Sequence, residues 1–165
     1  MAETEKKPSR KMLTAVVDSL CNIPLFDRLN GEELSVLAKY VNVIEVNPGE
    51  YVFKEGDRGD YICFVENGSL DVMKRSSAGG SAIIATLTQG RSIGEMSVID
   101  NFPRSATIRA RTRATLLTLT RSRFDLILEQ YPTIGVKILK GISRLLSQNL
   151  RRTSSQLADY ILPLA

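Results

Sequence analysis

Hydrophobic residues recur at helical spacing in the first quarter of the chain. Over residues 12–22 they form one stripe, which consists of Leu13, Val16, Val17 and Leu20. This spacing predicts an amphipathic helix. Asn30, followed three residues later by Glu33, is typical of a second helix start. That helix is expected to direct inward Leu34, Leu37, Ala38 and Val41.

The middle of the chain changes to short apolar stretches separated by turn residues. The turns are Asn47-Pro48-Gly49, Gly56-Asp57, Asn67-Gly68 and Gly79-Gly80. Such spacing predicts an antiparallel β-sandwich or barrel. One strand is expected over residues 108–114, where Ile108, Ala110, Thr112 and Ala114 alternate with Arg109, Arg111 and Arg113. A period of two places the arginines in water. They could bind nucleic acid or form a solvated sheet face, and we favour the sheet face.

Helical spacing returns in the last third of the chain. Ser122 with Asp125 predicts a helix start, and Pro132 is expected to interrupt that helix. Its inward residues would be Phe124, Ile127 and Leu128. A long helix is then predicted from about residue 133 to 160. Steps of four and three along it connect Leu146, Leu150, Thr153, Leu157, Tyr160 and Leu164. This row is either a dimer seam of coiled-coil type or a face that packs on the chain's own barrel.

Composition removes several classes of function. The 165 residues carry a net charge of +4 and include no histidine. Serine-hydrolase triads and histidine-ligated zinc are therefore excluded, and we expect neither enzymatic activity nor a metal. Cys21 and Cys63 are far apart and form no metal or redox motif, so we expect both to be free core thiols. No apolar run approaches the roughly 20 residues of a membrane span, and a cytoplasmic protein is expected.

The segment from Ile93 to Ile108 combines features that suit a phosphate and a sugar hydroxyl. Gly94 lacks a Cβ, so a ligand can approach its backbone closely. Arg104 supplies a planar fork for two phosphate oxygens. Glu95 would be repelled by a phosphate and is better suited to accept from ribose hydroxyls. In isolation, the same Glu and Arg could simply form a surface salt bridge.

This segment resembles the phosphate-binding cassette of the cyclic nucleotide-binding domain family, with its Gly-Glu, variable stretch and Arg-(Ser/Thr/Ala)-Ala. The turns at Asn47-Pro48-Gly49-Glu50, Glu55-Gly56-Asp57, Gly59-Asp60 and Asn67-Gly68 resemble the glycine series of that family. The likeness covers about residues 20–160. It implies a β-roll or jelly-roll barrel with N-terminal helices and a long C-terminal helix, and thus a mainly β protein with flanking helices.

The resemblance also implies roles for individual residues. Glu95 would accept from the ribose 2′-hydroxyl, and Arg104 would bind the cyclic phosphate. Backbone N–H groups near Gly94, Met96, Ser105 and Ala106 would complete the cradle, with help from the Ser105 hydroxyl. In the catabolite-activator branch a Thr-Ser pair on the long helix reads adenine, partly across a dimer. Thr153-Ser154 stands where that pair is expected, although both residue types are also common on exposed helix faces.

These expectations divide the chain into a flexible basic tail (1–11), a β-roll with N-terminal helices (12–131) and a C-terminal lid or dimerisation helix (132–165). The ligand would be cyclic AMP or cyclic GMP, with Thr153-Ser154 favouring cyclic AMP. Partners would be a second copy and a downstream protein, but neither a membrane nor DNA. No helix-turn-helix segment follows the long helix before Ala165. The chain could be a stand-alone receptor or a piece of a longer protein. A weak DNA-binding regulator and a ligand-free scaffold remain as alternatives.

Overall fold

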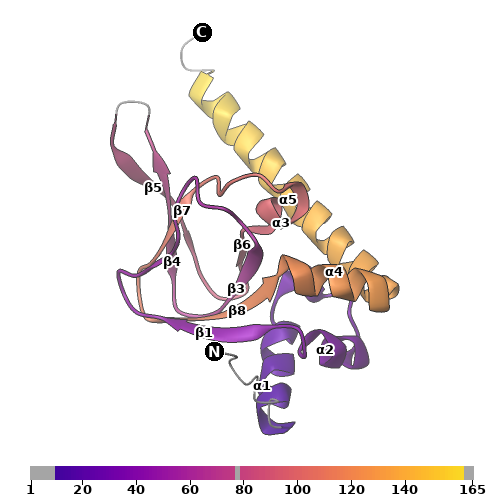
Figure 1. Ribbon diagram of the computed structural model, residues 1–165. Coiled ribbons are helices and arrows are strands. Elements are labelled where there is room, and N and C mark those ends of the chain that lie inside the picture. The colour runs from indigo at the N-terminus through magenta and orange to yellow at the C-terminus, as the bar shows by residue number, and fades with distance from the viewer. Residues whose placement is uncertain (1–9, 77–78, 162–165) are drawn as a thin grey trace.

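Two antiparallel sheets form the body of the protein (Figure 1). The computed structural model describes residues 10–76 and 79–161. One sheet has the order β1 (Asn42–Val46), β8 (Ala114–Thr120), β3 (Tyr61–Asn67), β6 (Ser92–Ile93). The other has the order β2 (Tyr51–Phe53), β7 (Thr107–Ala110), β4 (Leu70–Arg75), β5 (Ser81–Leu87). The predicted antiparallel β architecture with flanking helices is therefore confirmed.

The sheet residues divide between two hydrophobic cores. On β3, Cys63 and Val65 are buried among residues of both sheets, including Leu70, Ile108 and Leu116. Their neighbours in sequence pack instead against helices, as Ile62 and Phe64 do. Because successive side chains point to opposite faces of a sheet, β3 is buried on both faces. This explains why its residues 62–65 are all apolar.

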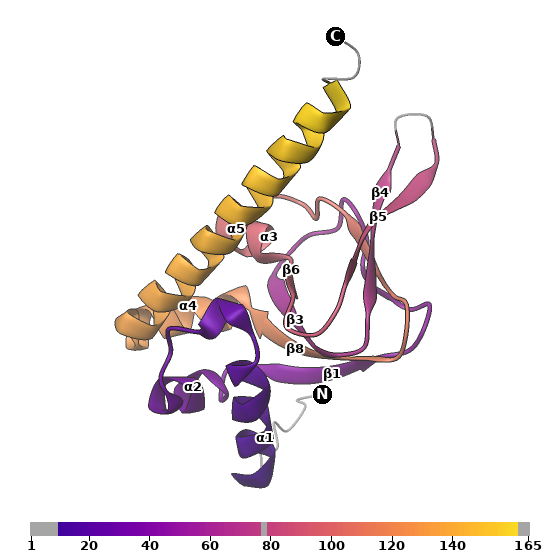
Figure 2. The ribbon, with the colours of Figure 1, turned by 180° about the vertical axis from the view of Figure 1, so that it is seen from behind.

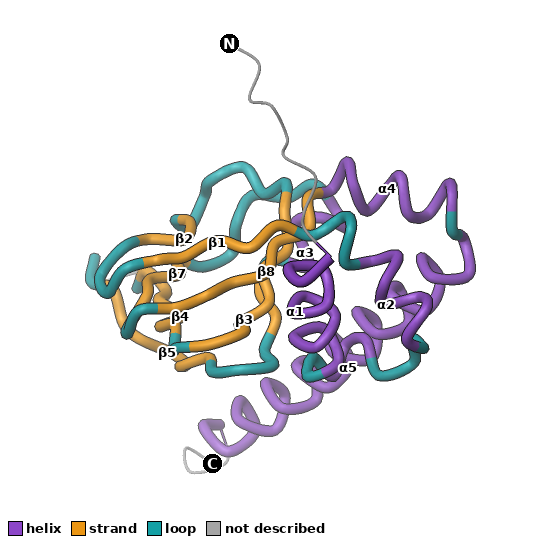
Figure 3. The backbone as a smooth tube through the Cα atoms, turned by 90° about the horizontal axis from the view of Figure 1, so that it is seen from below, coloured by secondary structure: helices purple, strands orange, loops and turns teal. Residues whose placement is uncertain are grey.

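The helices gather on one side of the sheets (Figures 2 and 3). They are α1 (Arg10–Cys21), the short 3-10 helix η1 (Pro24–Phe26), α2 (Gly31–Leu37), α3 (Glu95–Asp100), α4 (Arg121–Gln130) and α5 (Pro132–Ile161). The predicted start of α2 is confirmed by a reciprocal capping box, in which Asn30 Oδ1 accepts from the Glu33 N–H and Glu33 Oε2 accepts from the Asn30 N–H, both at 2.9 Å.

The long C-terminal helix is confirmed as α5. Its first half packs on α4 and η1, where a Cβ on Gly141 would lie 2.3 Å from the carbonyl oxygen of Leu25. The second half extends away from the body (Figure 1), and every residue from Ser147 to Ile161 is exposed. Among the helices of the described residues, none has the length and apolar character needed to cross a membrane.

Two predicted boundaries are wrong. The strand predicted over 108–114 ends at Ala110, because the N–H groups of Arg111 and Thr112 both donate to the Ser69 carbonyl in a turn. Thr112 therefore does not point into the core. The start of α4 is capped by Thr120 instead of Ser122, since the Thr120 hydroxyl accepts from the Arg123 N–H at 3.3 Å.

Only one of the two free cysteines lies in the core, and the predicted arginine row is partly ion-paired. Cys63 is buried as expected, whereas Cys21 is exposed at the last residue of α1. Arg109 and Arg111 lie 3.7 Å and 3.8 Å from the carboxylate of Asp71. Only Arg109 lies on a strand, since Arg111 and Arg113 belong to the turn between β7 and β8. The favoured sheet face is therefore correct for Arg109 alone.

Candidate functional site

Gly94 joins strand β6 to helix α3 and requires the freedom of glycine. Its φ of +83° lies in the left-handed region. A Cβ at this position would also lie 2.2 Å from Nη1 of Arg104. The conformation and the close approach together exclude a larger residue without rearrangement, and they place the backbone of Gly94 directly against the Arg104 side chain.

The Arg104 side chain is almost fully buried. Its Nη1 donates to the carbonyl of Gly94 at 3.2 Å, and its Nη2 donates to the carbonyl of Tyr61 at 2.8 Å. The guanidinium carbon lies 4.0 Å from the centre of the Phe53 ring and 4.6 Å from that of Tyr61. Such cation–π contacts stabilise a cation removed from water. The Nε atom is buried without a hydrogen-bond partner.

Glu95, the first residue of α3, is also buried, with 6% of its surface exposed. Its Oε2 has no hydrogen-bond partner. Burial raises the pKa of the Glu95 carboxyl, while a hydrogen bond from its own backbone N–H and the positive charge of Arg104 act in the opposite direction. Within the 93–108 segment, an acceptor atom of Glu95 and a donor atom of Arg104 thus lie buried without a hydrogen-bond partner.

The loop before β3 is hydrogen-bonded to the backbone of Arg104. The Arg104 N–H donates to the Asp57 carbonyl at 2.8 Å, and the Gly56 N–H donates to the Arg104 carbonyl at 2.9 Å. At Gly59 a Cβ would lie 2.2 Å from the Cβ of Ser97 and 3.1 Å from Nε of Arg104. Two turns of the predicted glycine series, those at Gly56 and Gly59, therefore lie against Arg104.

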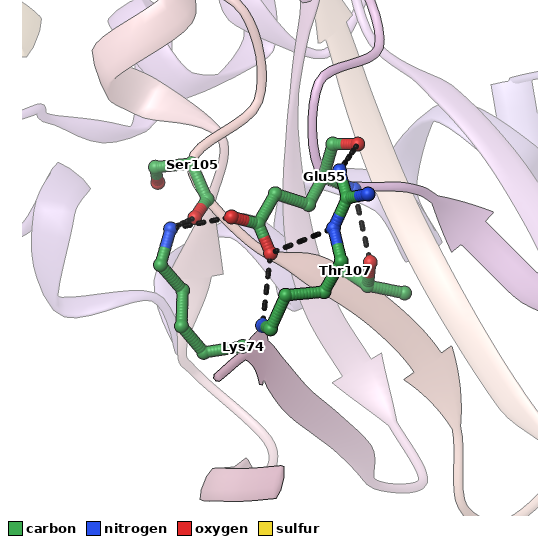
Figure 4. Close-up of polar contacts among 5 residues, drawn as sticks. Glu55, Lys74, Ser105 and Thr107 are labelled. Carbon is green, nitrogen blue, oxygen red and sulfur yellow. Dashed lines mark hydrogen bonds and ion pairs between the residues drawn. The ribbon is translucent and has the colours of Figure 1, made fainter. Parts of the chain in front are cut away.

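A second polar cluster lies beside the residue that follows Arg104 (Figure 4). Lys74 Nζ donates to the Ser105 carbonyl at 2.5 Å and to Glu55 Oε1 at 2.7 Å. The Glu55 N–H donates to the Thr107 hydroxyl at 2.9 Å. The Lys74 ammonium lowers the pKa of the Glu55 carboxyl. This cluster fixes the end of the segment to β4 and to the loop after β2.

The structure brings only part of the predicted set together. Gly94, Glu95 and Arg104 converge, whereas Met96 is half exposed and Ser105 is exposed at the surface. Ala106 is partly buried. Thr153 and Ser154 are exposed on the distal half of α5. Thr153 lines a separate groove of about 740 Å³ that Ser154 does not line.

Several residues that shape the site were absent from the predicted set. Phe53 and Tyr61 provide the aromatic faces around Arg104, and the Tyr61 hydroxyl donates to the Val52 carbonyl at 2.8 Å. Arg121 Nη2 donates to the carbonyls of Gly59, at 2.8 Å, and of Ser97. The only signal for Tyr61 was its place directly after Gly59-Asp60. No sequence pattern indicated Phe53 or Arg121, because each of them contacts residues that are distant in the sequence.

The family model of the cyclic nucleotide-binding domain matches residues 43–131. This range includes the buried Glu95 and Arg104 and every strand from β2 to β8. The chain therefore belongs to the cyclic nucleotide-binding domain family, and the resemblance found in the sequence is confirmed.

Individual relatives agree with this assignment. The cAMP-dependent protein kinase regulatory subunit of Yarrowia lipolytica is 35% identical over 109 residues, which cover 66% of this chain and 28% of that protein. The cGMP-dependent protein kinase of Plasmodium berghei is 34% identical over 118 residues, covering 72% and 13%. This chain thus spans less than a third of either kinase protein.

A solved structure covers nearly all of the chain. The crystal structure of a cyclic nucleotide-binding domain from Methylobacillus flagellatus has a TM-score of 0.79 and 30% identity to this chain. The similarity extends over 94% of this chain and 85% of that one. It therefore reaches into the helices that precede and follow the strands in sequence.

Proposed function

We propose that this chain is a regulatory module that binds a cyclic nucleotide at Gly94, Glu95 and Arg104. The observation that carries the proposal is the pair of unpaired polar atoms, Glu95 Oε2 and Arg104 Nε, in nearly fully buried side chains. A buried polar group without a hydrogen bond costs about 1–3 kcal/mol. A ligand that carries both a hydroxyl donor and an anionic acceptor would satisfy both atoms.

Each residue has a chemical role in this proposal. Arg104 would bind the cyclic phosphate through charge-assisted hydrogen bonds, and Glu95 would accept from the ribose 2′-hydroxyl. The phosphate cradle would be completed by N–H groups near Gly94, Met96, Ser105 and Ala106, with the Ser105 hydroxyl. Lys74, bound to the Ser105 carbonyl, supports this assignment because its positive charge also favours an anion there.

Cyclic AMP is the ligand that we propose first. Support comes from Thr153 and Ser154, hydroxyl residues on the long helix at the positions where the catabolite-activator branch reads adenine. The relatives themselves are divided, since one is named as a cAMP-dependent and another as a cGMP-dependent kinase protein. Cyclic GMP is therefore the ligand to test beside it.

Signalling would proceed through α4 and α5. Arg121, the first residue of α4, donates to the carbonyls of Gly59 and Ser97, which border the proposed pocket. Helix α4 in turn packs on α5. A ligand that shifts α3 would thus favour a different packing of α5, by a change of population between two arrangements. The regulated output would be a protein partner, since one relative is named as the regulatory subunit of a protein kinase.

The test is a calorimetric titration of nucleotide-free protein with cyclic AMP and with cyclic GMP. We expect saturable binding near one ligand per chain, tighter for cyclic AMP. Arg104→Ala should nearly abolish it, because the phosphate loses its charge partner. Arg104→Lys keeps a positive charge and most of the buried side chain. This variant should still bind the cyclic nucleotide weakly, which would show that the fold persists. Near-normal affinity in Arg104→Ala would refute the assigned pocket.

A further inference from the structure

The chain contains two Asn-Gly dipeptides, Asn30-Gly31 and Asn67-Gly68. In such a pair the backbone nitrogen of the glycine can attack the side-chain carbonyl carbon of the asparagine, because glycine has no Cβ to obstruct the approach. Both asparagines are exposed, so water reaches either side chain. The two pairs therefore share their local chemistry and differ in the geometry that the fold imposes on them.

The Asn67 side chain folds back onto the residue that follows it. Asn67 ends β3, and Gly68 begins the turn that leads to β4. The Gly68 N–H donates to Asn67 Oδ1 at 2.7 Å. Because the C=O bond adds about 1.2 Å at most, Cγ of Asn67 lies less than about 4 Å from the Gly68 nitrogen. Atoms poised to react are about 3–3.5 Å apart, so a small rotation of the Asn67 side chain completes the approach.

The Asn30 side chain is held by a different partner. Its Oδ1 accepts from the Glu33 N–H at 2.9 Å, and Glu33 Oε2 accepts from the Asn30 N–H at the same distance. Gly31 is the first residue of α2, so its backbone nitrogen is fixed in the first helical turn. The capping box thus engages the Asn30 carbonyl group with Glu33 and withholds it from the Gly31 nitrogen.

The turn at Gly68 is packed closely against the turn between β7 and β8. Gly68 has a φ of +85°, and a Cβ on it would lie 2.4 Å from the Arg113 carbonyl oxygen. The Ser69 carbonyl accepts from the Arg111 N–H at 2.9 Å, and the Ser69 N–H donates to the Thr112 hydroxyl at 3.0 Å. An extra backbone atom at this turn would therefore disturb the contact between the two turns.

We propose that Asn67 is a site of spontaneous deamidation, which the folded chain converts to isoaspartate and aspartate far faster than it converts Asn30. The Gly68 nitrogen bonds to Cγ of Asn67, and the bond from Cγ to Nδ2 breaks. The side-chain nitrogen leaves as ammonia with the proton of the Gly68 N–H, and a succinimide ring remains. Water then opens this ring at one of its two carbonyl carbons, and no group is oxidised or reduced.

The two products differ in the path of the main chain. Attack of water at Cγ restores the original backbone and gives aspartate, which still offers an acceptor to the Gly68 N–H. Attack at the main-chain carbonyl carbon gives isoaspartate, whose backbone runs through Cβ and Cγ and is one methylene longer. Both products add a negative charge to the turn. Isoaspartate should in addition loosen the hydrogen bonds that join Ser69 to Arg111 and Thr112.

The test follows the full chain over time in a mildly alkaline buffer. Peptides from each sample are analysed by fragmentation mass spectrometry, which distinguishes isoaspartate from aspartate at each asparagine. In the folded protein Asn67 should deamidate about tenfold or more faster than Asn30, because misplacement of reacting atoms by about 1 Å can cost this much in rate. The same measurement in concentrated urea is the control. Unfolding removes the capping box and the Asn67 hydrogen bond, so the two rates should become similar.

Two variants separate the chemistry from its consequence. Asn67→Gln should abolish the product at this position and leave the rate at Asn30 unchanged, because the extra methylene moves the carbonyl carbon away from the Gly68 nitrogen. Asn67→Asp supplies the aspartate product directly. Its midpoint of urea unfolding should be close to that of the unmodified protein, whereas the isoaspartate form isolated from an aged sample should unfold at a lower urea concentration.

Three results would overturn the proposal. The first is an equal or higher rate at Asn30 than at Asn67 in the folded protein. The second is a difference between the two rates that persists in urea, since the fold would then not be its cause. The third is aspartate without isoaspartate, because direct hydrolysis of the side chain gives aspartate alone. The measurement requires no nucleotide, so its result is separate from that of the proposed ligand site.

Discussion

Individual residues of the proposed site are held in arrangements that cost stability. Glu95 and Arg104 each have a buried polar atom without a partner, and Gly94 adopts a left-handed φ against the Arg104 side chain. Such groups are usually satisfied in folded proteins. The third such atom among the described residues, Nε of Arg121, belongs to the side chain that donates to the carbonyls of Gly59 and Ser97. The proposed ligand would supply partners for the first two.

The pairing of Gly94 and Arg104 can be tested against a glycine with the same backbone conformation. Gly94→Ala should lose about 1–2 kcal/mol of stability from its φ and also bind cyclic AMP about tenfold or more weakly, since the methyl group displaces Arg104. Gly49→Ala is the control, because Gly49 has a φ of +85° with no atom within 4 Å of its Cβ position. It should lose stability without losing affinity. Equal affinities in the two variants would contradict the pairing.

The raised pKa of Glu95 predicts a pH dependence of stability. A carboxyl whose pKa is higher in the folded state binds more protons when folded, so its contribution falls as pH rises above its unfolded value near 4.5. Glu95→Gln cannot ionise. It should therefore be more stable than the unmodified protein at pH 7, and this gain should shrink towards zero below pH 4.5. Urea unfolding across this range measures the difference, and a pH-independent difference would refute the assignment.

At the scale of elements, the α5 helix has two halves with different surroundings. Its first half is locked to η1 and α4 through positions where glycine permits close packing, whereas its second half is exposed. Helix propensity alone would favour alanine over glycine in both halves. Packing reverses this preference only where a neighbouring backbone lies against the helix.

Gly141→Ala tests this division. The added Cβ would lie 2.3 Å from the Leu25 carbonyl oxygen, so the substitution should destabilise the protein by about 1–3 kcal/mol despite its better helix propensity. Ser147→Ala, at an exposed position of the same helix, should be neutral or slightly stabilising. Thermal unfolding of both variants provides the measurement. Stabilisation by Gly141→Ala would show that α5 does not pack on η1 at this point.

At the scale of the whole molecule, the exposed row on α5 raises the question of assembly. Leu150, Leu157 and Tyr160 are exposed by 68%, 59% and 81%, while Leu146 is partly buried. Leu164 lies outside the described residues. In the single chain Leu150, Leu157 and Tyr160 therefore lie outside the core, whereas Leu146 packs against it. The dimer stays a prediction.

Sedimentation equilibrium over a range of concentrations tests the dimer. We expect reversible association, because burying apolar side chains of a seam contributes about 25 cal/mol per Å². Leu150→Glu with Leu157→Glu should abolish it by placing charges in the seam. Leu126→Glu is the control, since Leu126 is exposed by 41% on α4 and lies off the row. A monomer at all concentrations, or equal effects of both sets of variants, would refute the seam.

The sequence by itself determined the features that depend on neighbours along the chain. The capping box of Asn30 and Glu33, the break at Pro132 and the long helix beyond it follow local rules, and all three are confirmed. The Gly-Glu and Arg-Ser-Ala segment, together with the glycine series upstream of it, indicated the family that the family model confirms. The strand predicted to 114 was too long, since a distant residue, Ser69, provides the contacts that end it at Ala110.

Only the tertiary structure decided how distant segments meet. It placed Phe53 and Tyr61 around the Arg104 guanidinium, left Cys21 exposed, and tied Ser105 to β4 through Lys74. It also placed Thr153 across a groove from the edge of β5, a relation between elements more than 60 residues apart. The physical reason is that contacts between distant residues depend on sheet order and helix packing, which periodicity along one segment does not specify.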